Sequence, residues 1–67
     1  MTFKLKFKDI DEERNLPDDD YTINDLLKEL GLSSQTIVAK QNGELVIEET
    51  AIESGDEIQL VQIIYGG

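Results

Sequence analysis

The sequence predicts an α+β fold in which a five-stranded mixed sheet carries one helix across one face. Three observations indicate it: a strictly alternating segment at the start, one helical stripe in the middle, and β-rich segments around an Asn-Gly turn and at the end. At 67 residues the chain has room for one small domain. We expect this domain to span 1–64, followed by a flexible tail over 65–67.

The alternating segment, residues 2–8, reads Thr-Phe-Lys-Leu-Lys-Phe-Lys. A period of two places three apolar side chains on one face of a strand and three lysines on the other. The apolar set is Phe3, Leu5 and Phe7, and the basic set is Lys4, Lys6 and Lys8. The lysines are typical of a solvated sheet face, and the sequence assigns them no further role.

Residues 9–20 are rich in Asp and Glu. We expect a turn, a short edge strand near 13–16 and a loop, because Pro17 cannot donate a hydrogen bond within a central strand. The carboxylate spacing resembles a calcium loop, but Arg14 stands where such a loop requires glycine, and no helices flank it. We therefore expect a solvated acidic loop and no metal site.

The middle of the chain carries signals for both ends of a helix. Thr22 and Asp25 have the spacing of a capping box, and Gly31 is suited to the left-handed residue that ends a helix. Leu32 can then pack back on Leu27. Between the two ends, four apolar residues follow the i, i+3, i+4, i+7 spacing of one helical stripe: Ile23, Leu26, Leu27 and Leu30.

Three β-rich segments complete the chain. Residues 36–41 and 44–48 flank Asn42-Gly43, a strong signal for a two-residue hairpin turn, and residues 54–57 predict another turn. Residues 58–64 are apolar on both faces, which is typical of a central strand. With the helix crossing over between two hairpins, the first and last strands can pair in parallel at the centre. This arrangement is a β-grasp, or ubiquitin-like roll.

Alternation also predicts which side chains point toward the core and which point away from it. We expect Ile58 and Leu60 to face the helix, together with Ile37 and Ala39 on the neighbouring strand. An exposed apolar patch that binds a partner would then consist of Val38, Val61 and Ile63. The alternative is that these are the scattered apolar residues found on any sheet.

The composition excludes several classes of chemistry. Without cysteine or histidine the chain has no thiol nucleophile, no Cys/His zinc site and no Ser-His-Asp triad, so we expect a protein that is not an enzyme. A formal charge of −9 argues against nucleic acid and suits a basic protein partner, or serves solubility alone. No apolar run approaches the ~20 residues of a membrane span, and no signal peptide is evident. We expect a cytoplasmic monomer.

The last thirteen residues, Gly55-Asp56-Glu57-Ile58-Gln59-Leu60-Val61-Gln62-Ile63-Ile64-Tyr65-Gly66-Gly67, carry a specific resemblance. The Gly-Asp turn, the apolar strand and the final Gly-Gly pair resemble the ending of the ThiS and MoaD sulfur carriers and of the related small archaeal modifier proteins. Tyr65 departs from the small residue typical of ThiS and MoaD at that position and is closer to the archaeal modifiers.

The resemblance implies that Gly66 and Gly67 form an activated C-terminus, used by an adenylating partner related to the ubiquitin-activating enzymes. ATP and magnesium would be cofactors of that partner, and this chain itself would bind none. The product would be a thiocarboxylate passed to a sulfur-accepting enzyme, or an isopeptide bond to target-protein lysines. Tyr65 could anchor in a partner pocket.

Several alternatives stay open at this point. Thiamin synthesis, molybdopterin synthesis, tRNA thiolation and protein conjugation are not distinguished by these residues. A rival from another class is a β-grasp module that binds partners non-covalently and has an inert Gly-Gly end. Glycine at 66 and 67 favours the first class, because residues without Cβ atoms can be threaded through a narrow channel.

Overall fold

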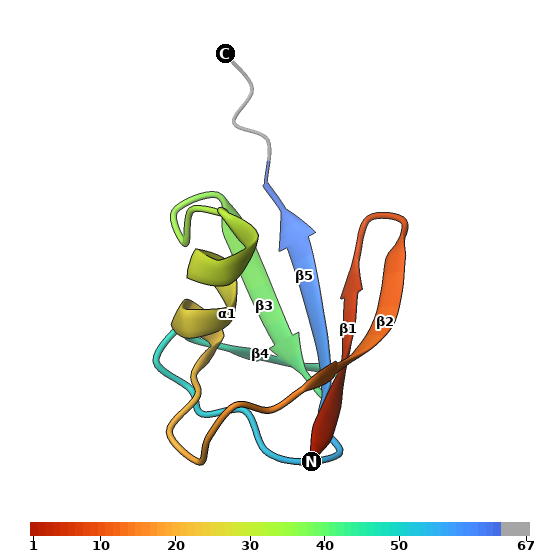
Figure 1. Ribbon diagram of the computed structural model, residues 1–67. Helices are drawn as coiled ribbons and strands as arrows, with labels where there is room; N and C mark the ends of the chain where they lie inside the picture. Colours follow the sequence, from red (N-terminus) through yellow and green to blue (C-terminus); the bar gives the residue numbers. More distant parts are fainter. Residues whose placement is uncertain (64–67) are drawn as a thin grey trace.

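The computed structural model describes residues 1–63, which form one mixed sheet with a helix packed across one face (Figure 1). The element order is β1 (Thr2–Phe7), β2 (Ile10–Asn15), α1 (Ile23–Leu30), β3 (Ile37–Gln41), β4 (Glu44–Val46) and β5 (Glu57–Gln62). The strands lie side by side in the order β2-β1-β5-β3-β4. This is the predicted β-grasp.

The first and last strands pair in parallel at the centre of the sheet. Lys4 lies opposite Glu57, and Phe7 lies opposite Leu60. All other pairs in the sheet, β1 with β2, β3 with β4 and β3 with β5, are antiparallel. β5 therefore lies between β1 and β3, as the sequence predicted.

Both predicted helix ends are present in α1. Thr22 accepts a hydrogen bond from the Asp25 N–H at 3.3 Å, and the Asp25 carboxylate accepts one from the Thr22 N–H at 3.1 Å. Gly31 closes the helix with φ 72°, a left-handed angle that glycine adopts without a Cβ clash. The Leu32 N–H then donates to the Leu27 carbonyl at 2.9 Å, as in a Schellman motif.

The core lies between α1 and the sheet face that it covers. Its members are the apolar residues that alternation and helical spacing assign to the inside, together with Tyr21 and Ile52 from the connections. The buried set is Phe3, Leu5, Phe7, Tyr21, Ile23, Leu26, Leu27, Ile37, Ala39, Ile52, Ile58 and Leu60.

The acidic segment corrects the prediction of a short strand near 13–16. β2 begins already at Ile10, because Lys8 and Asp9 close a tight turn and the next six residues pair with β1 along their whole length. Lys8 has φ 54° and lies in this turn, not in the row of outward-facing strand lysines. The acidic side chains 11–13 thus belong to an edge strand, where both faces are solvated and apolar alternation is absent.

The predicted strand 44–48 is also too long. β4 ends at Val46, and the Glu48 carbonyl instead accepts a hydrogen bond from the Asn24 N–H at 2.8 Å. The Thr50 carbonyl likewise accepts from the Ile23 N–H at 3.0 Å. The chain leaves the sheet here because its carbonyls satisfy the N–H groups at the start of α1, which have no partner within the helix.

Candidate docking face and activated end

The predicted activated end, Gly66 and Gly67, lies outside the described residues, as do Ile64 and Tyr65. The structure does describe the strand that leads to it. β5 is central, and the Ile63 N–H donates to the Thr36 carbonyl at 2.7 Å, which extends the pairing with β3 by one residue. The residues before the Gly-Gly pair are therefore held within the sheet up to Ile63.

Three of the predicted docking residues are placed by the structure on the side of the sheet away from α1. Val38 and Val61 are directly opposite each other on β3 and β5, and in an antiparallel pair such residues share a face. Val61 is 41% exposed and Ile63 is 39% exposed, whereas Leu60, the residue before Val61, is 3% exposed. The predicted face assignment is confirmed, while the binding role of this patch stays a prediction.

Sequence reasoning missed two further residues of the same face. Leu45 on β4 is 68% exposed and lies opposite Lys40 on β3. Lys40 is two residues from Val38 and so shares its face. The signal was available, because a two-residue turn at Asn42-Gly43 places residue 40 opposite residue 45. We call Val38, Leu45, Val61 and Ile63 the outer apolar patch.

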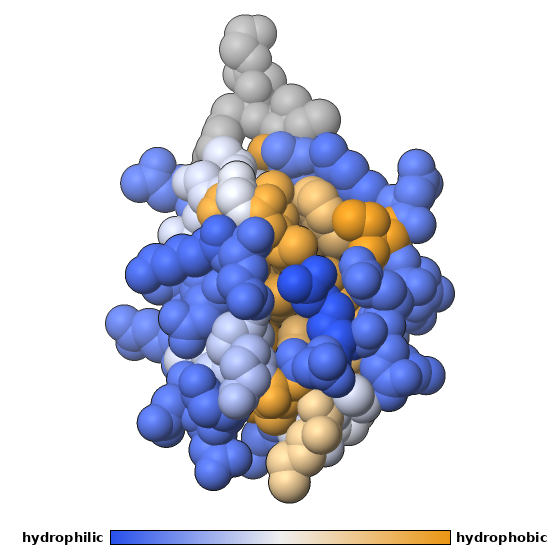
Figure 2. Space-filling view, in the orientation of Figure 1, coloured by the Kyte–Doolittle hydropathy of each residue, from blue (hydrophilic) through white to orange (hydrophobic). Residues whose placement is uncertain are grey.

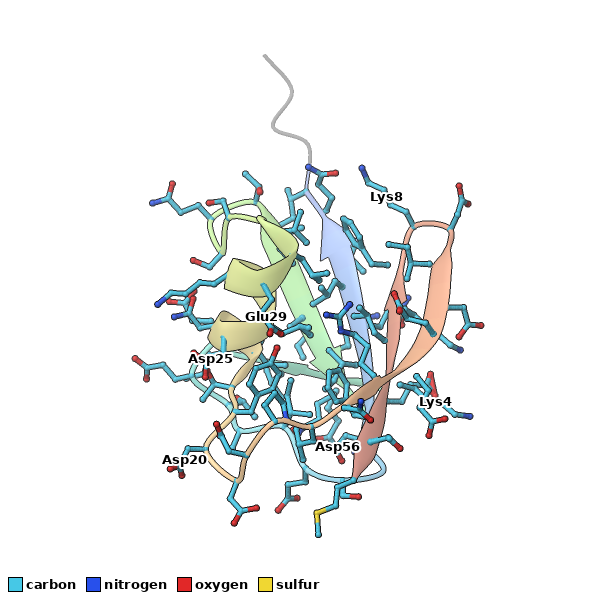
Figure 3. The ribbon with its side chains drawn as sticks, viewed as in Figure 1. Lys4, Lys8, Asp20, Asp25, Glu29 and Asp56 are labelled. Carbon is cyan, nitrogen blue, oxygen red and sulfur yellow. The ribbon has the colours of Figure 1, made fainter. Side chains whose placement is uncertain are left out.

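Lysines border the outer apolar patch. Lys6 lies on the same face of β1 and forms an exposed ion pair with Glu57, with 3.2 Å between Nζ and Oε1. Lys8 lies in the β1–β2 turn near the end of β5, with its Nζ 5.3 Å from the centre of the Phe7 ring (Figure 3). With Lys40 these residues give the outer face a basic border on a chain that is otherwise strongly acidic.

The turn that begins β5 is fixed at the opposite end of the sheet by Asp56, which is 8% exposed (Figure 3). Its carboxylate accepts hydrogen bonds from the Glu53 N–H at 2.8 Å, Gln41 Nε2 at 2.6 Å and Asn42 Nδ2 at 3.0 Å. Its backbone carbonyl accepts from the Lys4 N–H at 2.8 Å. One residue thus joins the start of β5 to β1 and to the β3–β4 hairpin.

The pKa of Asp56 is held below its usual value. Burial of the carboxyl raises the pKa, but the hydrogen bonds from the Glu53 backbone, Asn42 and Gln41 lower it by more. The charged form is therefore the stable one at neutral pH. This carboxylate serves the fold, since its oxygens are occupied by neighbouring donors.

Tyr21 connects the loop before α1 to the helix. Its hydroxyl donates a hydrogen bond to the Glu29 carboxylate. The pKa of Tyr21 is raised, first by burial and then by the hydrogen bond to Glu29. The phenol therefore stays protonated and acts as a donor.

Among residues 1–63, no group of three or more Asp or Glu side chains is placed to hold a metal ion. No helix described there is long and apolar enough to cross a membrane.

Comparison with known proteins agrees with this geometry. SAMP1 from Haloferax volcanii superposes with a TM-score of 0.73 over the full length of both chains at 21% identity. The thiamine biosynthesis protein ThiS from Geobacter metallireducens superposes with a TM-score of 0.66, covering 96% of this chain and 99% of that one at 17% identity. At these identities the two structures establish the β-grasp fold. The sequence model of the ThiS family matches residues 4–67, nearly the whole chain including Gly66-Gly67, and the chain therefore belongs to the ThiS family.

Proposed function

We propose that this ubiquitin-like protein acts through the carboxylate of Gly67, which an adenylating partner activates. The observation that supports this most is the family match, because it runs through the Gly-Gly pair at the end of the sequence. The fold is that of a sulfur carrier or protein modifier.

Activation is required because a C-terminal carboxylate is ionised at neutral pH and is a poor electrophile. One carboxylate oxygen of Gly67 attacks the α-phosphorus of ATP, and the bond to pyrophosphate breaks. A nucleophile then attacks the acyl carbon of the adenylate, and AMP leaves. A sulfur nucleophile leads to a thiocarboxylate, and a lysine amine leads to an isopeptide bond. Metal and cationic groups of the partner would stabilise the charge on the phosphate.

The outer apolar patch is proposed as the surface that holds the domain against this partner. It lies beside the end of β5, and an extended chain covers at most ~3.5 Å per residue, so four residues reach only a short distance beyond Ile63. A partner must therefore dock close to the end of β5 for its catalytic centre to meet Gly67. The lysine border favours acidic residues on the partner around an apolar centre.

The proposal is tested by pyrophosphate exchange. Incubation with a cognate adenylating enzyme, ATP and magnesium should yield ATP–pyrophosphate exchange, and a chain lacking Gly67 should show none. The matched control is Asp19→Ala, an exposed loop change that should leave exchange unchanged. Exchange that persists without Gly67 would exclude this mechanism and favour the rival, a non-covalent module with an inert end. A thiocarboxylate would appear in the intact mass as one oxygen replaced by sulfur.

A further inference from the structure

The outer edge of β2 is a strand edge without a partner strand. β2 is the outermost strand on its side of the sheet and pairs only with β1. The Leu16 N–H donates to the Met1 carbonyl at 2.8 Å, and this bond fixes which rungs of the β1–β2 ladder are hydrogen-bonded. Because bonded and non-bonded rungs alternate, the backbone groups of Asp11, Glu13 and Asn15 point away from β1.

These outward groups have no other backbone partner among the described residues, since no backbone hydrogen bond outside the ladders involves them. β2 therefore offers an N–H and a C=O at every second residue along its length. The other edge of the sheet is much shorter, because β4 has only three residues. An added strand would find its longest pairing surface on β2.

The pairing of β2 with β1 shows which residues β2 accepts opposite its own. Lys4 lies opposite Glu13, and Lys6 lies opposite Asp11, so each lysine of β1 on the outer face stands across from an acidic residue. The contacts these side chains make are the ion pair of Lys6 with Glu57 and the hydrogen bond that the Glu13 carboxylate accepts from the Thr2 hydroxyl at 2.6 Å. Opposite charges directly across a strand pair are favourable. A strand on the other side of β2 would meet the same two carboxylates at its own directly opposite residues. Its residues at those positions should therefore be basic.

The intervening residues of an added strand would face the helix side of the sheet. There Ile10 is 39% exposed, Arg14 is half-buried and pairs with Glu12 at 3.8 Å, and apolar surface runs between α1 and β2 (Figure 2). A second basic residue on this side would meet Arg14, whereas an apolar side chain can pack beside Ile10. The edge therefore favours basic and apolar residues in alternation.

We propose that the outer edge of β2 binds an extended segment of a protein partner, in which Lys or Arg alternates with apolar residues, as an additional antiparallel strand. A second copy of this chain is disfavoured as the occupant. Pairing β2 with another β2 brings carboxylates against carboxylates, and charged edges of this kind prevent self-association. β1 separates this edge from β5 and the outer apolar patch, so a domain engaged at that patch could still bind at β2.

The backbone part of the proposal is tested with the full-length protein and an acetylated, amidated Lys-Val-Lys-Val-Lys-Val peptide, by NMR titration at low salt. Shifts should concentrate on β2. In an antiparallel addition the lysine amides, opposite Asp11 and Glu13, are the donors, so N-methylation of the lysines should abolish binding. N-methylation of the valines, whose amides point away, should preserve it. Equal binding by both methylated peptides, or by a Lys-Lys-Lys-Val-Val-Val control, would overturn the proposal.

The charge part is tested on the protein. Each opposed pair should contribute roughly two- to fivefold in affinity, so Asp11→Lys with Glu13→Lys should weaken peptide binding about tenfold or more. Asp18→Lys with Asp19→Lys makes the same change in net charge in an exposed loop and should weaken binding less than about twofold near physiological salt. Equal weakening by the two double variants would show that the charge of the whole chain, not the edge, attracts the peptide.

Glu13→Pro supplies the variant that leaves the backbone ladder with β1 intact, because the Glu13 N–H points outward and the ladder does not use it. It removes one exposed side-chain link to β1, the hydrogen bond from the Thr2 hydroxyl to the Glu13 carboxylate. Its thermal transition should stay close to that of the parent chain, and peptide binding should fall at least tenfold. Unchanged binding, or a dimer of the parent chain that this substitution dissociates, would refute a heterologous partner at this edge. Pyrophosphate exchange should be unaffected, which separates this test from that of Gly67.

Discussion

Asp56 connects the start of β5 to β1 and to the β3–β4 hairpin through its hydrogen bonds. Replacing it by alanine removes the acceptor of the Glu53 N–H and of the Asn42 amide and one of the two acceptors of the Gln41 amide, which keeps the Ala51 carbonyl, and we expect a loss of about 3 kcal/mol in the free energy of unfolding. Urea denaturation measures the loss. Asp19→Ala removes an exposed carboxylate and should stay within about 0.5 kcal/mol of the parent. A similar stability for both variants would contradict the role given to Asp56.

The same carboxylate gives a prediction for pH. Since the pKa of Asp56 is lower in the folded chain than in the unfolded chain, its contribution is present above the unfolded value, about 3.9, and is lost as the pH falls through the folded value. The stability difference between the parent and Asp56→Asn should therefore be constant from about pH 5 to 7 and shrink below about pH 4. Urea denaturation across this range tests it, and a difference that grows on acidification would contradict the lowered pKa.

Adjacent residues on β5 should respond in opposite ways to the same substitution. Leu60→Asp buries a charge in the core and should cost at least about 3 kcal/mol of stability, whereas Val61→Asp on the outer face should cost less than about 1 kcal/mol. Binding to an adenylating partner should fall at least tenfold for Val61→Asp. Scanning calorimetry measures the stability, and titration calorimetry measures the affinity for the partner. A folded Val61→Asp chain with unchanged affinity would remove the outer apolar patch from the proposed interface.

At the scale of elements, α1 depends on the cap that begins it. Thr22→Ala removes the oxygen that accepts from the Asp25 N–H and should lower the free energy of unfolding by about 1 kcal/mol, while Thr22→Ser should restore most of it. Lys28→Ala, an exposed change in the same helix, serves as the control and should stay within about 0.5 kcal/mol. If Thr22→Ala and Lys28→Ala lower the free energy of unfolding in urea by the same amount, the cap does not contribute measurably to the stability of the domain.

The elements also differ in how well the sequence predicts them. α1 and the β3–β4 hairpin carry local signals, a capping box and an Asn-Gly turn, that act through a few neighbouring residues. β2 carries none, because an edge strand with both faces in water needs no apolar alternation, and only its pairing with β1 defines it. The end of β4 depends on the Glu48 carbonyl meeting the Asn24 N–H, a contact between distant residues.

Residues of the candidate site also differ in how well the sequence predicts them. Alternation on β5 was enough to place Val61 and Ile63 outside the core, whereas Leu45 required the register across the hairpin. The role proposed for Gly66-Gly67 rests on resemblance, since two glycines have no chemistry of their own beyond backbone freedom and a carboxylate. Physical patterns therefore predicted which residues lie on the exposed face, and the family relationship is the basis of the reaction that we propose.

At the scale of the whole molecule, the formal charge of −9 opposes the compact state. Raising the salt from about 0.01 M to about 0.15 M shortens the Debye length from about 30 Å to about 8 Å and should raise the melting temperature by several degrees. Peptide binding at the β2 edge should weaken over the same range. Calorimetry at matched pH measures the first effect, and a melting temperature that falls with salt would indicate that attractive pairs outweigh the repulsion.

The parallel pairing of β1 with β5 has a mechanical consequence. Because the two strands run in the same direction, the start of β1 and the end of β5 lie at opposite ends of the sheet (Figure 1). A force that pulls these ends apart loads the rungs between Lys4–Phe7 and Glu57–Leu60 in shear, so that they must yield together and not one after another. A molecule attached beyond β5 and dragged against an anchored N-terminus would therefore meet strong resistance before the domain unravels.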